Sequence, residues 1–506
     1  MRRLFKLLSS RLFWMFLLFA TQTAFIVYLV LWASFTEGAL FFFTGLSVVL
    51  GVIVMSRNER APYKMVWLFI LVIFPLFGGV FYLLFGDKKI GKLSQKKLAA
   101  FWKKLPDSSS YISTVEDGYN KLSEEYKRTS TFIRNTTNLP AWSNTECEYF
   151  AYGEDFFVDV VKELEKAKKF IFIEYFIIAE GKWWGRMLEV LKRKVKEGVD
   201  VRVLYDDMGT ISALPASYSW TLRSYGIKCC CFNRIKMRIN PRLNFRDHRK
   251  ILSIDGNICY TGGLNLADEY ANDELRFGYW KDSAIKLKGA AVWNLTFLFL
   301  RMWGCLTNDD DDLSLYIPTI SVEGSGAVQP FGDNPFDDAT VTENTYLELL
   351  NNARRYVWIT TPYLIPDEAI SDTLKRAAKA GIDVRIITPH YPDKKSVFEV
   401  TRSNYQSLLE AGVKIYEFTP GFIHSKCFIV DDEVCCIGTT NIDYRSLYLH
   451  FELSVMLYGC DVIEDIKEDY EKTLMLSKQQ TLEDVKKIGF YTWAKRFVFK
   501  LFSPAL

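Results

Sequence analysis

The pattern of apolar and polar positions divides the chain into an apolar N-terminal part and a long remainder in which short apolar stretches alternate with charged ones. Three apolar runs precede residue 87, at positions 12–35, 39–55 and 65–85. A helix needs about 20 apolar residues to cross a bilayer, so the first and third runs are long enough and the second is marginal. The first run follows a basic start, as a signal peptide does, but it is too long for the apolar core of such a peptide. We therefore expect residues 1–110 to form a membrane anchor with two or three transmembrane helices, the third kinked at Pro75.

Basic residues flank the apolar runs and bear on the side of the membrane that the rest of the chain occupies. Three arginines and a lysine precede the first run, and seven lysines follow the third with no acid among them: Lys88, Lys89, Lys92, Lys96, Lys97, Lys103 and Lys104. Such residues favour the cytoplasmic side and suit anionic head groups. We expect the first two runs to form a tight pair and the third not to cross fully, with the remainder in the cytoplasm. Three full crossings with an outside N-terminus would leave the remainder on the same side.

Composition narrows the class of protein only moderately. The 506 residues are enough for about three domains. Hydrophobic residues make up 49% and charged residues 24%, which excludes a disordered, collagen-like or coiled-coil protein. A net charge of +3 is too small to indicate nucleic-acid binding. Several of the ten cysteines are adjacent, as at 229–231 and 435–436, so we expect reduced thiols in a reducing compartment rather than a disulfide framework.

Two stretches after residue 150 have nearly the same sequence, which indicates an internal repeat. Residues 191–203 read LKRKVKEGVDVRV and residues 374–386 read LKRAAKAGIDVRI, each the end of a basic amphipathic helix, a glycine stop and a buried strand. Strands that alternate with helices in this way predict an α/β sheet. The repeat predicts two similar α/β domains, 111–306 and 345–506, that share one interface.

The segment between these domains, 307–344, is expected to be an exposed linker. It contains four consecutive aspartates and two clusters of glycine with serine, asparagine or proline, which are typical of turns and loops. The aspartates lack the spacing of an EF-hand loop, so we expect a solvated acidic loop rather than a calcium site.

Each copy of the repeat contains the same spacing of five residue types, H-x-K-x4-D-x6-G-x2-N. The first copy places them at His248, Lys250, Asp255, Gly262 and Asn265, and the second at His424, Lys426, Asp431, Gly438 and Asn441. Only four histidines occur in the chain, so two such matches at corresponding places of a repeat are not accidental. Ionisable residues are seldom buried without a reason, which argues against two histidines that merely fill the core.

The spacing within the motif predicts one site shared by the two domains. Side chains two apart on a strand face the same way, so each histidine should point with its lysine. Asp255 and Gly256 form a turn dipeptide, after which a returning strand delivers the asparagine. A pseudo-twofold pairing of the domains would bring two histidines, two lysines and two asparagines together. The lysines and amides would hold a phosphate, one imidazole would attack phosphorus and the other would protonate the leaving alkoxide, with no metal required.

Two further acidic residues occupy matching places after the motifs. Asp282 precedes the segment SAIKL and Glu452 precedes LSVML. A carboxylate against an imidazole N–H would fix its tautomer and support positive charge on the ring, although an ordinary acid at the start of a strand is the alternative. The remaining histidines lie outside the motifs. We expect His390 in a loop near the mouth of the site and His450 in a structural or supporting role.

The two H-x-K-x4-D motifs resemble those of the phospholipase D superfamily. The segments that extend the likeness to bacterial cardiolipin synthases are 65–86, 244–250, 279–282, 421–426, 441–446 and 501–504. The resemblance therefore covers nearly the whole chain. That family commonly has two apolar runs near the N-terminus, whereas this chain has three.

The resemblance implies an enzyme of the bacterial cell membrane that transfers a phosphatidyl group from one phosphatidylglycerol to another and releases glycerol, without a cofactor. The site residues that it implies are His248, Lys250, Asp255, His424, Lys426 and Asp431, supported by Asn265, Asn441, Asp282 and Glu452. It implies His248 as nucleophile and His424 as acid, and phosphatidylglycerol and anionic membrane lipid, not nucleic acid, as partners. The alternatives are a phospholipase D-type hydrolase, another phosphatidyltransferase, a nuclease, or an inactive membrane scaffold. The anchor and the modest charge disfavour the nuclease, and the intact double motif disfavours the scaffold.

Overall fold

A computed structural model of the chain describes residues 37–57, 59–86, 115–235, 245–336 and 339–505, together with residue 108 and a few single positions between 20 and 31. The chain folds as two compact units. The first comprises Met1–Lys97, Asn233–Asn244 and Leu501–Leu506, and the second comprises Leu98–Phe232 and Phe245–Lys500.

Three helices form the described part of the first unit: α3 (Glu37–Ser56), α4 (Ala61–Ile73) and α5 (Pro75–Phe85). They pack around a small core of Leu50, Val54, Leu71 and Tyr82. The Ser47 hydroxyl donates a hydrogen bond of 2.6 Å to the carbonyl of the proline that begins α5. The short 3-10 helix η5 (Ser503–Ala505) lies beside α4 in this unit.

The expected transmembrane helices are not supported by this part of the structure. Among the described residues, no helix combines the length and the apolar character that a membrane crossing requires. The 65–85 run forms two helices instead of one, because Pro75 lacks a backbone N–H to continue α4 and the preceding Phe74 leaves the helical region (φ −123°, ψ 64°). Most of the 12–35 run and the lysines from 88 to 104 lie outside the described residues.

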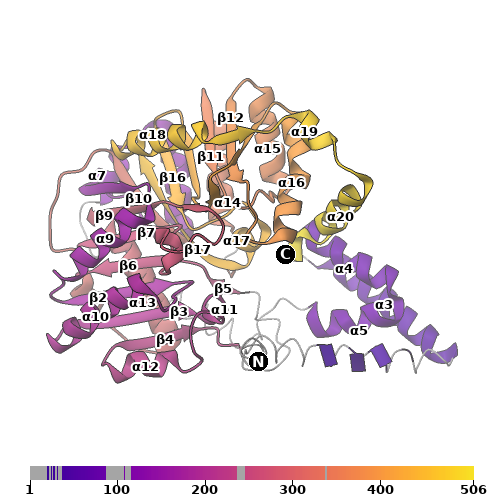
Figure 1. The fold of residues 1–506 in the computed structure, drawn as a ribbon, viewed down its shortest axis with the longest axis horizontal. Helices are drawn as coiled ribbons and strands as arrows, with labels where there is room; N and C mark the ends of the chain where they lie inside the picture. Colours follow the sequence, from indigo (N-terminus) through magenta and orange to yellow (C-terminus); the bar gives the residue numbers. More distant parts are fainter. Residues whose placement is uncertain are drawn as a thin grey trace. The chain divides into compact units, whose positions relative to one another are not determined.

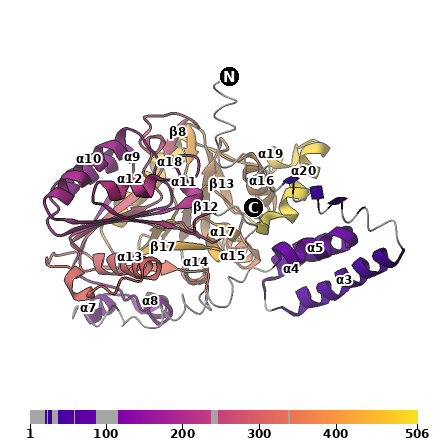
Figure 2. The same cartoon turned by 90° about the horizontal axis from the view of Figure 1, so that it is seen from below.

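The second unit contains two sheets (Figures 1 and 2), and the seven strands of the first are repeated in the same order in the second, which confirms the predicted α/β repeat. The second sheet has an additional strand at its end. The first sheet has the order β1 (Thr145–Phe150), β9 (Ala284–Gly289), β7 (Ile258–Gly262), β6 (Lys250–Ile254), β2 (Phe170–Tyr175), β3 (Asp200–Asp206), β4 (Lys228–Phe232). The second has the order β10 (Ala327–Asp333), β17 (His450–Tyr458), β16 (Val434–Gly438), β15 (Cys427–Val430), β11 (Tyr356–Thr360), β12 (Asp383–Pro389), β13 (Lys414–Phe418), β18 (Ser477–Gln479). In each sheet the strand pairs β2–β3–β4 or β11–β12–β13 are parallel, whereas the motif strands β6 and β15 pair antiparallel with their neighbours.

Helices cover the faces of both sheets. The helices of this unit up to residue 307 are α7 (Val115–Asn120), α8 (Glu124–Thr137), α9 (Gly153–Leu164), α10 (Lys182–Lys196), α11 (Asp207–Thr210), α12 (Tyr218–Ser224), η3 (Asp268–Ala271) and α13 (Val292–Thr307). Those that follow are η4 (Leu313–Tyr316), α14 (Val341–Asn352), α15 (Glu368–Lys379), α16 (Lys395–Leu409), α17 (Tyr444–Tyr448), α18 (Val462–Met475), α19 (Leu482–Lys486) and α20 (Phe490–Leu501). The repeated basic helices are α10 and α15. Gly198 (φ +89°) and Gly381 (φ +95°) follow them in the left-handed region, as the glycine stops predict.

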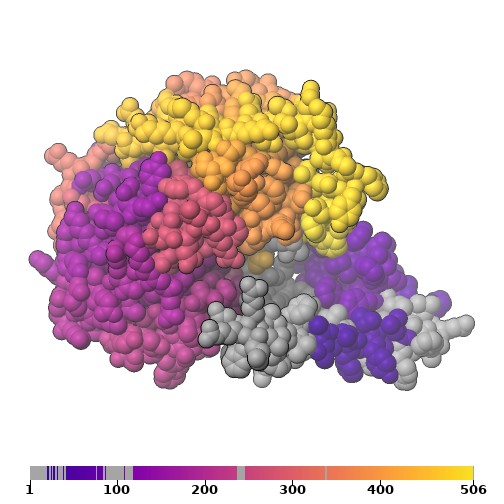
Figure 3. All heavy atoms as spheres, viewed as in Figure 1, coloured from indigo at the N-terminus to yellow at the C-terminus, as the bar shows by residue number. Residues whose placement is uncertain are grey.

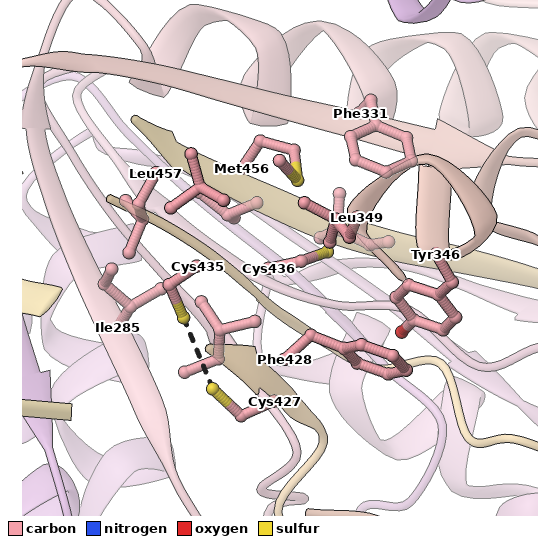
Figure 4. Close-up of a cluster of buried hydrophobic side chains, with 14 of the residues drawn as sticks. Ile285, Phe331, Tyr346, Leu349, Cys427, Phe428, Cys435, Cys436, Met456 and Leu457 are labelled. Atoms are coloured by element: carbon pink, nitrogen blue, oxygen red, sulfur yellow. Dashed lines mark hydrogen bonds between the residues drawn. The ribbon is translucent and has the colours of Figure 1, made fainter. Parts of the chain in front are cut away.

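A large hydrophobic cluster contains residues of both sheets, and a second cluster lies almost wholly in the first half. From outside, the coloured atoms of the two halves form one mass (Figure 3). Helix α13 is buried from Val292 to Gly304. Figure 4 shows Ile285 of β9, from the first half, beside Cys435 of β16 and Leu457 of β17, from the second. All ten cysteines are free thiols, including the neighbours Cys427 and Cys435, whose sulfur atoms are 3.3 Å apart.

The structure differs from the expected linker at 307–344, because this segment carries β10, the strand that pairs along seven residues with β17. The acidic residues at its start are partly engaged as well. Asp311 accepts two hydrogen bonds, of 2.6 and 2.8 Å, from the guanidinium of Arg202 on β3. The aspartate run is thus held against the first sheet by the ion pair of Asp311 with Arg202, and its other carboxylates expose charge to solvent.

Two short parallel strand pairs link the halves across the repeat. Strand β5 (Arg246–Asp247) pairs with the start of β17, and β14 (Gly421–Ile423) pairs with β8 (Tyr279–Lys281). Both β5 and β14 immediately precede a motif histidine. The residues with which they pair immediately precede one of the two matching acids. Each half therefore inserts the beginning of its motif beside the acid of the other half.

Candidate active site

Each motif histidine lies at the end of one of these exchanged strands. The backbone N–H of His248 donates 2.9 Å to the carbonyl of Phe451, and that of His424 donates 2.7 Å to the carbonyl of Lys281. The histidines therefore precede the sheet strands rather than lying on them, which differs from the expected strand geometry. The pairing of β5 with β17 and of β14 with β8, and not the alternation of side chains along a strand, therefore sets the direction in which the two imidazoles point.

The two carboxylates predicted to orient the imidazoles do contact them, and each comes from the opposite half. Nδ1 of His248 lies 2.9 and 3.0 Å from the two oxygens of Glu452. Nδ1 of His424 lies 2.7 Å from Asp282. Both carboxylates are completely buried. A carboxylate at Nδ1 holds the proton there, so each ring presents Nε2 for chemistry.

The motif lysines fold back beside their histidines, as the spacing predicts. Nζ of Lys250 donates 2.6 Å to the carbonyl of His248, and Nζ of Lys426 donates to the carbonyl of His424. Burial lowers the pKa of Lys250 to about 8 and that of Lys426 to about 7, even though Asp282 and Glu452 act in the opposite direction. The two ammonium groups are therefore short of a compensating anion, which a phosphate would supply.

The electrostatics of the imidazoles show that the two motifs converge. Burial lowers the pKa of His248 well below its usual value, and the charges of both motif lysines lower it further. Burial, followed by the charge of Lys426 and, more weakly, that of Lys250, lowers the pKa of His424 to about 4, although Asp282 raises it. Each histidine is thus affected by the lysine of the other half. Both imidazoles therefore hold a proton less readily than an ordinary histidine, and a bound phosphate anion would raise their affinity for a proton.

The motif aspartates lie away from the imidazoles, at the far ends of the motif strands. The Asp255 carboxylate accepts hydrogen bonds of 2.8, 2.7 and 2.9 Å from the backbone N–H groups of residues 168, 169 and 170. Asp431 does the same at residues 354, 355 and 356, with distances of 2.6, 2.9 and 2.8 Å. Both adopt positive φ, 54° and 56°, in the turns that the sequence predicts. Their position corrects the expectation that they join the catalytic group: they fasten the turn to the start of the central strand.

Of the two asparagines expected in the phosphate clamp, Asn265 is engaged elsewhere, and the role of Asn441 stays a prediction. The Asn265 amide accepts 3.1 Å from the N–H of Ile177 and donates 2.7 Å to the hydroxyl of Tyr270, so it ties loops together. Asn441 is buried, and its Oδ1 has no hydrogen-bond partner among the described residues. The two copies of the motif thus place equivalent amides in different surroundings.

Several polar residues around the motifs were not expected from the sequence. Arg249, between the histidine and lysine of the first motif, forms a buried ion pair of 2.6 Å with Glu174. At the equivalent positions of the second half, Ser425 and Thr360 are joined by a hydrogen bond of 3.1 Å. Strand register establishes the equivalence, because Glu174 and Thr360 each lie opposite the residue that follows a motif lysine. The sequence shows that Arg249 and Ser425 occupy the same position of the two motifs and differ in type. Only the strand register identifies Glu174 and Thr360 as their partners.

The histidines outside the motifs have distinct surroundings. Nδ1 of His390 lies 2.9 Å from Glu417, a carboxylate that also binds Arg402. His450 lies two residues before Glu452, with its ring centroid 5.5 Å from that of His248. The described residues contain a single group of three or more histidine, cysteine, aspartate or glutamate side chains that could hold a metal ion. This group is His248, His450 and Glu452, whose ligand atoms all lie within 4.8 Å of one another.

Comparison with known proteins connects this geometry to a family. The family model described as "Cardiolipin synthase, PLD-like domain" matches residues 160–282 and 346–474, and one described as "Phospholipase_D-nuclease N-terminal" matches residues 45–86. The chain is 34% identical to a cardiolipin synthase of Halalkalibacterium halodurans over 94% of its own length and 95% of the relative's. The chain belongs to the cardiolipin synthase family of the phospholipase D superfamily.

Further comparisons agree with membership of the cardiolipin synthase family. Cardiolipin synthase 2 of Bacillus anthracis is 35% identical over 92% of this chain and 91% of its own. The fold resembles the crystal structure of a phosphatidylserine synthase of Haemophilus influenzae, with a TM-score of 0.57 over 75% of this chain and all of that one, at 15% identity. The chain is thus a phosphatidyltransferase with the phospholipase D fold, and each family-matched segment of its second unit contains one motif and the acid that contacts the histidine of the other motif.

Proposed function

We propose that the chain is a cardiolipin synthase that joins two phosphatidylglycerol molecules through a covalent phosphohistidine. The observation that carries this proposal is the reciprocal pairing of His248 with Glu452 and of His424 with Asp282. It provides two oriented imidazoles beside two lysines, which is the equipment for in-line displacement at a phosphodiester.

The first step forms a bond between Nε2 of His248 and the phosphorus of one phosphatidylglycerol. The bond from phosphorus to the glycerol head group breaks, and the leaving alkoxide takes a proton from Nε2 of His424, which a bound anion keeps protonated. Lys250 and Lys426 balance the charge on the phosphoryl oxygens. Glycerol then leaves the site.

The second step returns the enzyme to its starting state. A glycerol hydroxyl of a second phosphatidylglycerol gives its proton to Nε2 of His424 and attacks phosphorus. The bond from phosphorus to Nε2 of His248 breaks, which yields cardiolipin. One phosphodiester is exchanged for another, so the residues need no nucleotide and no metal ion to balance the reaction.

The alternative acceptors lead to different products from the same intermediate. Water would give phosphatidic acid, and another alcohol would give a different phospholipid. The decisive assay uses purified enzyme with phosphatidylglycerol labelled in its acyl chains and separates cardiolipin from phosphatidic acid. Cardiolipin with an equal amount of released glycerol supports the proposal, whereas phosphatidic acid as the sole product identifies a hydrolase and no turnover of the lipid argues for a scaffold. A nuclease would instead cleave oligonucleotides in the same preparation.

We further propose that the enzyme works at the bacterial cell membrane with its catalytic unit on the cytoplasmic side. The proposed substrate is a membrane lipid, and the helices of the first unit expose large apolar side chains, including Phe41, Val52, Met65 and Val72. A cysteine introduced near residue 115 should resist an impermeant thiol reagent in intact cells and react after lysis. Labelling in intact cells would place the catalytic unit outside.

A further inference from the structure

Helix α20 turns its apolar side to solvent. Phe490, Trp493 and Phe497 are spaced three and four residues apart, so they lie on one side of the helix. Their rings stack in sequence, with centroids 5.8 Å apart in both pairs, and the three residues are 81%, 52% and 62% exposed. Arg496, by contrast, is buried. A surface helix ordinarily packs its apolar stripe against the core and exposes its charges, so α20 has the reverse arrangement.

A carboxylate of α16 fixes α20 in this orientation. Nζ of Lys495 donates 2.6 Å to Oε1 of Glu399, and Nε of Arg496 donates 2.9 Å to Oε2. The side of the helix that carries these two cations therefore faces the protein. The stacked rings cannot turn inward unless both bonds to Glu399 break.

Glu399 lies near the edge of the second sheet at which the second motif begins. It is one turn after the start of α16, and α16 follows the loop that leaves β12. Because β11 and β12 are parallel, this loop leaves the sheet at the edge where β11 ends. At that end Thr360 lies opposite Cys427, the residue after the motif lysine Lys426. Helix α20 is thus attached beside the edge that carries the second motif.

Ring contacts connect the loop between β12 and α16 to the motif histidine of the second half. In this loop, Nζ of Lys394 lies 5.4 Å from the ring centroid of Tyr363. The Tyr363 ring lies 6.5 Å from that of Phe422, which lies 6.1 Å from the imidazole of His424. A surface that approaches the loop therefore approaches the candidate site.

Exposed cations near α20 are available to an anion. Lys394, Lys395 and Lys500 are exposed and form no ion pair within the part of the chain that the structure describes. Residues 486–500 contain five cations and no acid. Stacked aromatic rings beside unpaired lysines match a membrane surface with anionic head groups. They match a second copy of the chain poorly, because two such faces would bring like charges together.

We propose that α20 is an interfacial helix that lies on an anionic lipid surface, with its stacked rings at the level of the upper acyl chains and the lysines at the head groups. Such helices bind through buried apolar area and through attraction between their cations and anionic lipid. Contact through α20 brings the loop with Lys394 to the membrane, from which a lipid substrate enters the site. The inference rests on the proposed function, because it takes an anionic phospholipid as the substrate.

A fluorescence measurement reports on Trp493 whether or not the enzyme turns over. Full-length enzyme is bound to vesicles of phosphatidylglycerol and phosphatidylcholine, with or without bromine on the acyl chains. The emission of the Trp493→Phe variant is then subtracted from that of the unaltered enzyme. We expect bromine to quench most of this difference, because the indole lies among the acyl chains. Trp220→Phe is the matched control, since Trp220 on α12 is 67% exposed and should show no such quenching.

Kinetics on two forms of the substrate separate lipid contact from a structural role. The double variant Trp493→Ala with Phe497→Ala should lower kcat/KM on vesicles that contain long-chain phosphatidylglycerol by about tenfold or more, because two large rings no longer enter the lipid. It should leave kcat/KM on monomeric short-chain phosphatidylglycerol unchanged. Trp220→Ala should leave both values unchanged.

The outcomes distinguish the inference from the function on which it rests. Absence of bromine quenching at Trp493 would overturn the inference, and so would equal losses of kcat/KM on vesicles and on monomeric lipid. Loss of a dimer in the double variant, seen by sedimentation and without a change in kinetics on vesicles, would assign the face to a second copy instead. Failure of the unaltered enzyme to make cardiolipin would remove the proposed function, while the quenching would still report whether α20 enters lipid.

Discussion

The carboxylate of Asp282 lies 2.7 Å from Nδ1 of His424, a residue 142 positions later that belongs to the other copy of the repeat. The reciprocal contact joins Glu452 to His248 across 204 positions. Each half therefore supplies the motif histidine of one catalytic pair and the acid of the other. A single half would contain a histidine without its orienting carboxylate, which explains why the two copies are fused around one continuous core.

Removing either orienting carboxylate should impair turnover while the fold is retained. Asp282→Asn and Glu452→Gln keep the size of the side chain but no longer fix the proton at Nδ1, so we expect kcat to fall by roughly 10²- to 10⁴-fold. Because the pairs are crossed, Asp282→Asn and His424→Ala should be non-additive in their effect on the free energy of unfolding, which stays measurable in inactive variants. Full additivity of these two substitutions in a double-mutant cycle would contradict the pairing.

Both motif histidines should be indispensable. His248→Ala and His424→Ala each remove a group that makes or breaks a bond, and we expect cardiolipin formation to fall to background. His390→Ala serves as the control, because His390 binds Glu417 away from the motifs and should leave turnover close to normal. Enzyme incubated with radiolabelled phosphatidylglycerol and quenched in denaturant at alkaline pH, where the phosphorus–nitrogen bond survives, should carry the labelled phosphatidyl group on the peptide with His248. Label on the peptide with His424 would exchange the two roles.

The motif aspartates should affect stability more than chemistry. Asp255→Asn replaces a carboxylate that accepts three backbone N–H bonds, so we expect the free energy of unfolding to fall by about 1–3 kcal/mol. Well below the melting temperature, kcat should remain within about threefold of the original value, a ratio equivalent to less than 1 kcal/mol in the barrier. Thermal unfolding combined with kinetics at low temperature tests this, and a loss of activity without a loss of stability would restore a catalytic role.

Activity should decline as pH rises through the range in which the buried lysines lose their charge. The pKa of Lys426 is lowered to about 7 and that of Lys250 to about 8, so deprotonation on the alkaline side removes the charge that binds phosphate. We therefore expect kcat/KM to fall with increasing pH, because the pH dependence of kcat/KM follows the pKa values of groups in the free enzyme. Lys426→Arg stays charged and should move the alkaline limb upward, even if its rate is lower. A profile that is flat to pH 9 or above would refute the assignment.

Chelation of divalent metal should leave the chemical step intact. The lysines supply positive charge in the proposed mechanism, so activity on detergent-dispersed phosphatidylglycerol should persist in the presence of EDTA. Restoration of a lost activity by one specific metal at one ion per chain would show that the group formed by His248, His450 and Glu452 binds a required ion.

Local sequence patterns were sufficient for the repeat, for the α/β class and for the turns at the motif aspartates. Hydrophobic periodicity and glycine stops act over a few residues, so LKRKVKEGVDVRV and LKRAAKAGIDVRI each specify a helix, a turn and a buried strand without reference to the rest of the chain. The two motifs also singled out the histidines and lysines that we propose to be reactive. The same local reasoning predicted the break at Pro75 in the third apolar run, where one helix ends and another begins.

Only the tertiary structure decided which carboxylate orients which histidine. That choice depends on strand pairs between β5 and β17 and between β8 and β14, whose residues are far apart in the chain. Backbone hydrogen bonds in such pairs are the same for any side chains, so the sequence of one strand does not reveal its partner. The sequence by itself therefore determined the reactive groups and their spacing. The packing of the two sheets decided that each pair of histidine and carboxylate contains one residue from each half.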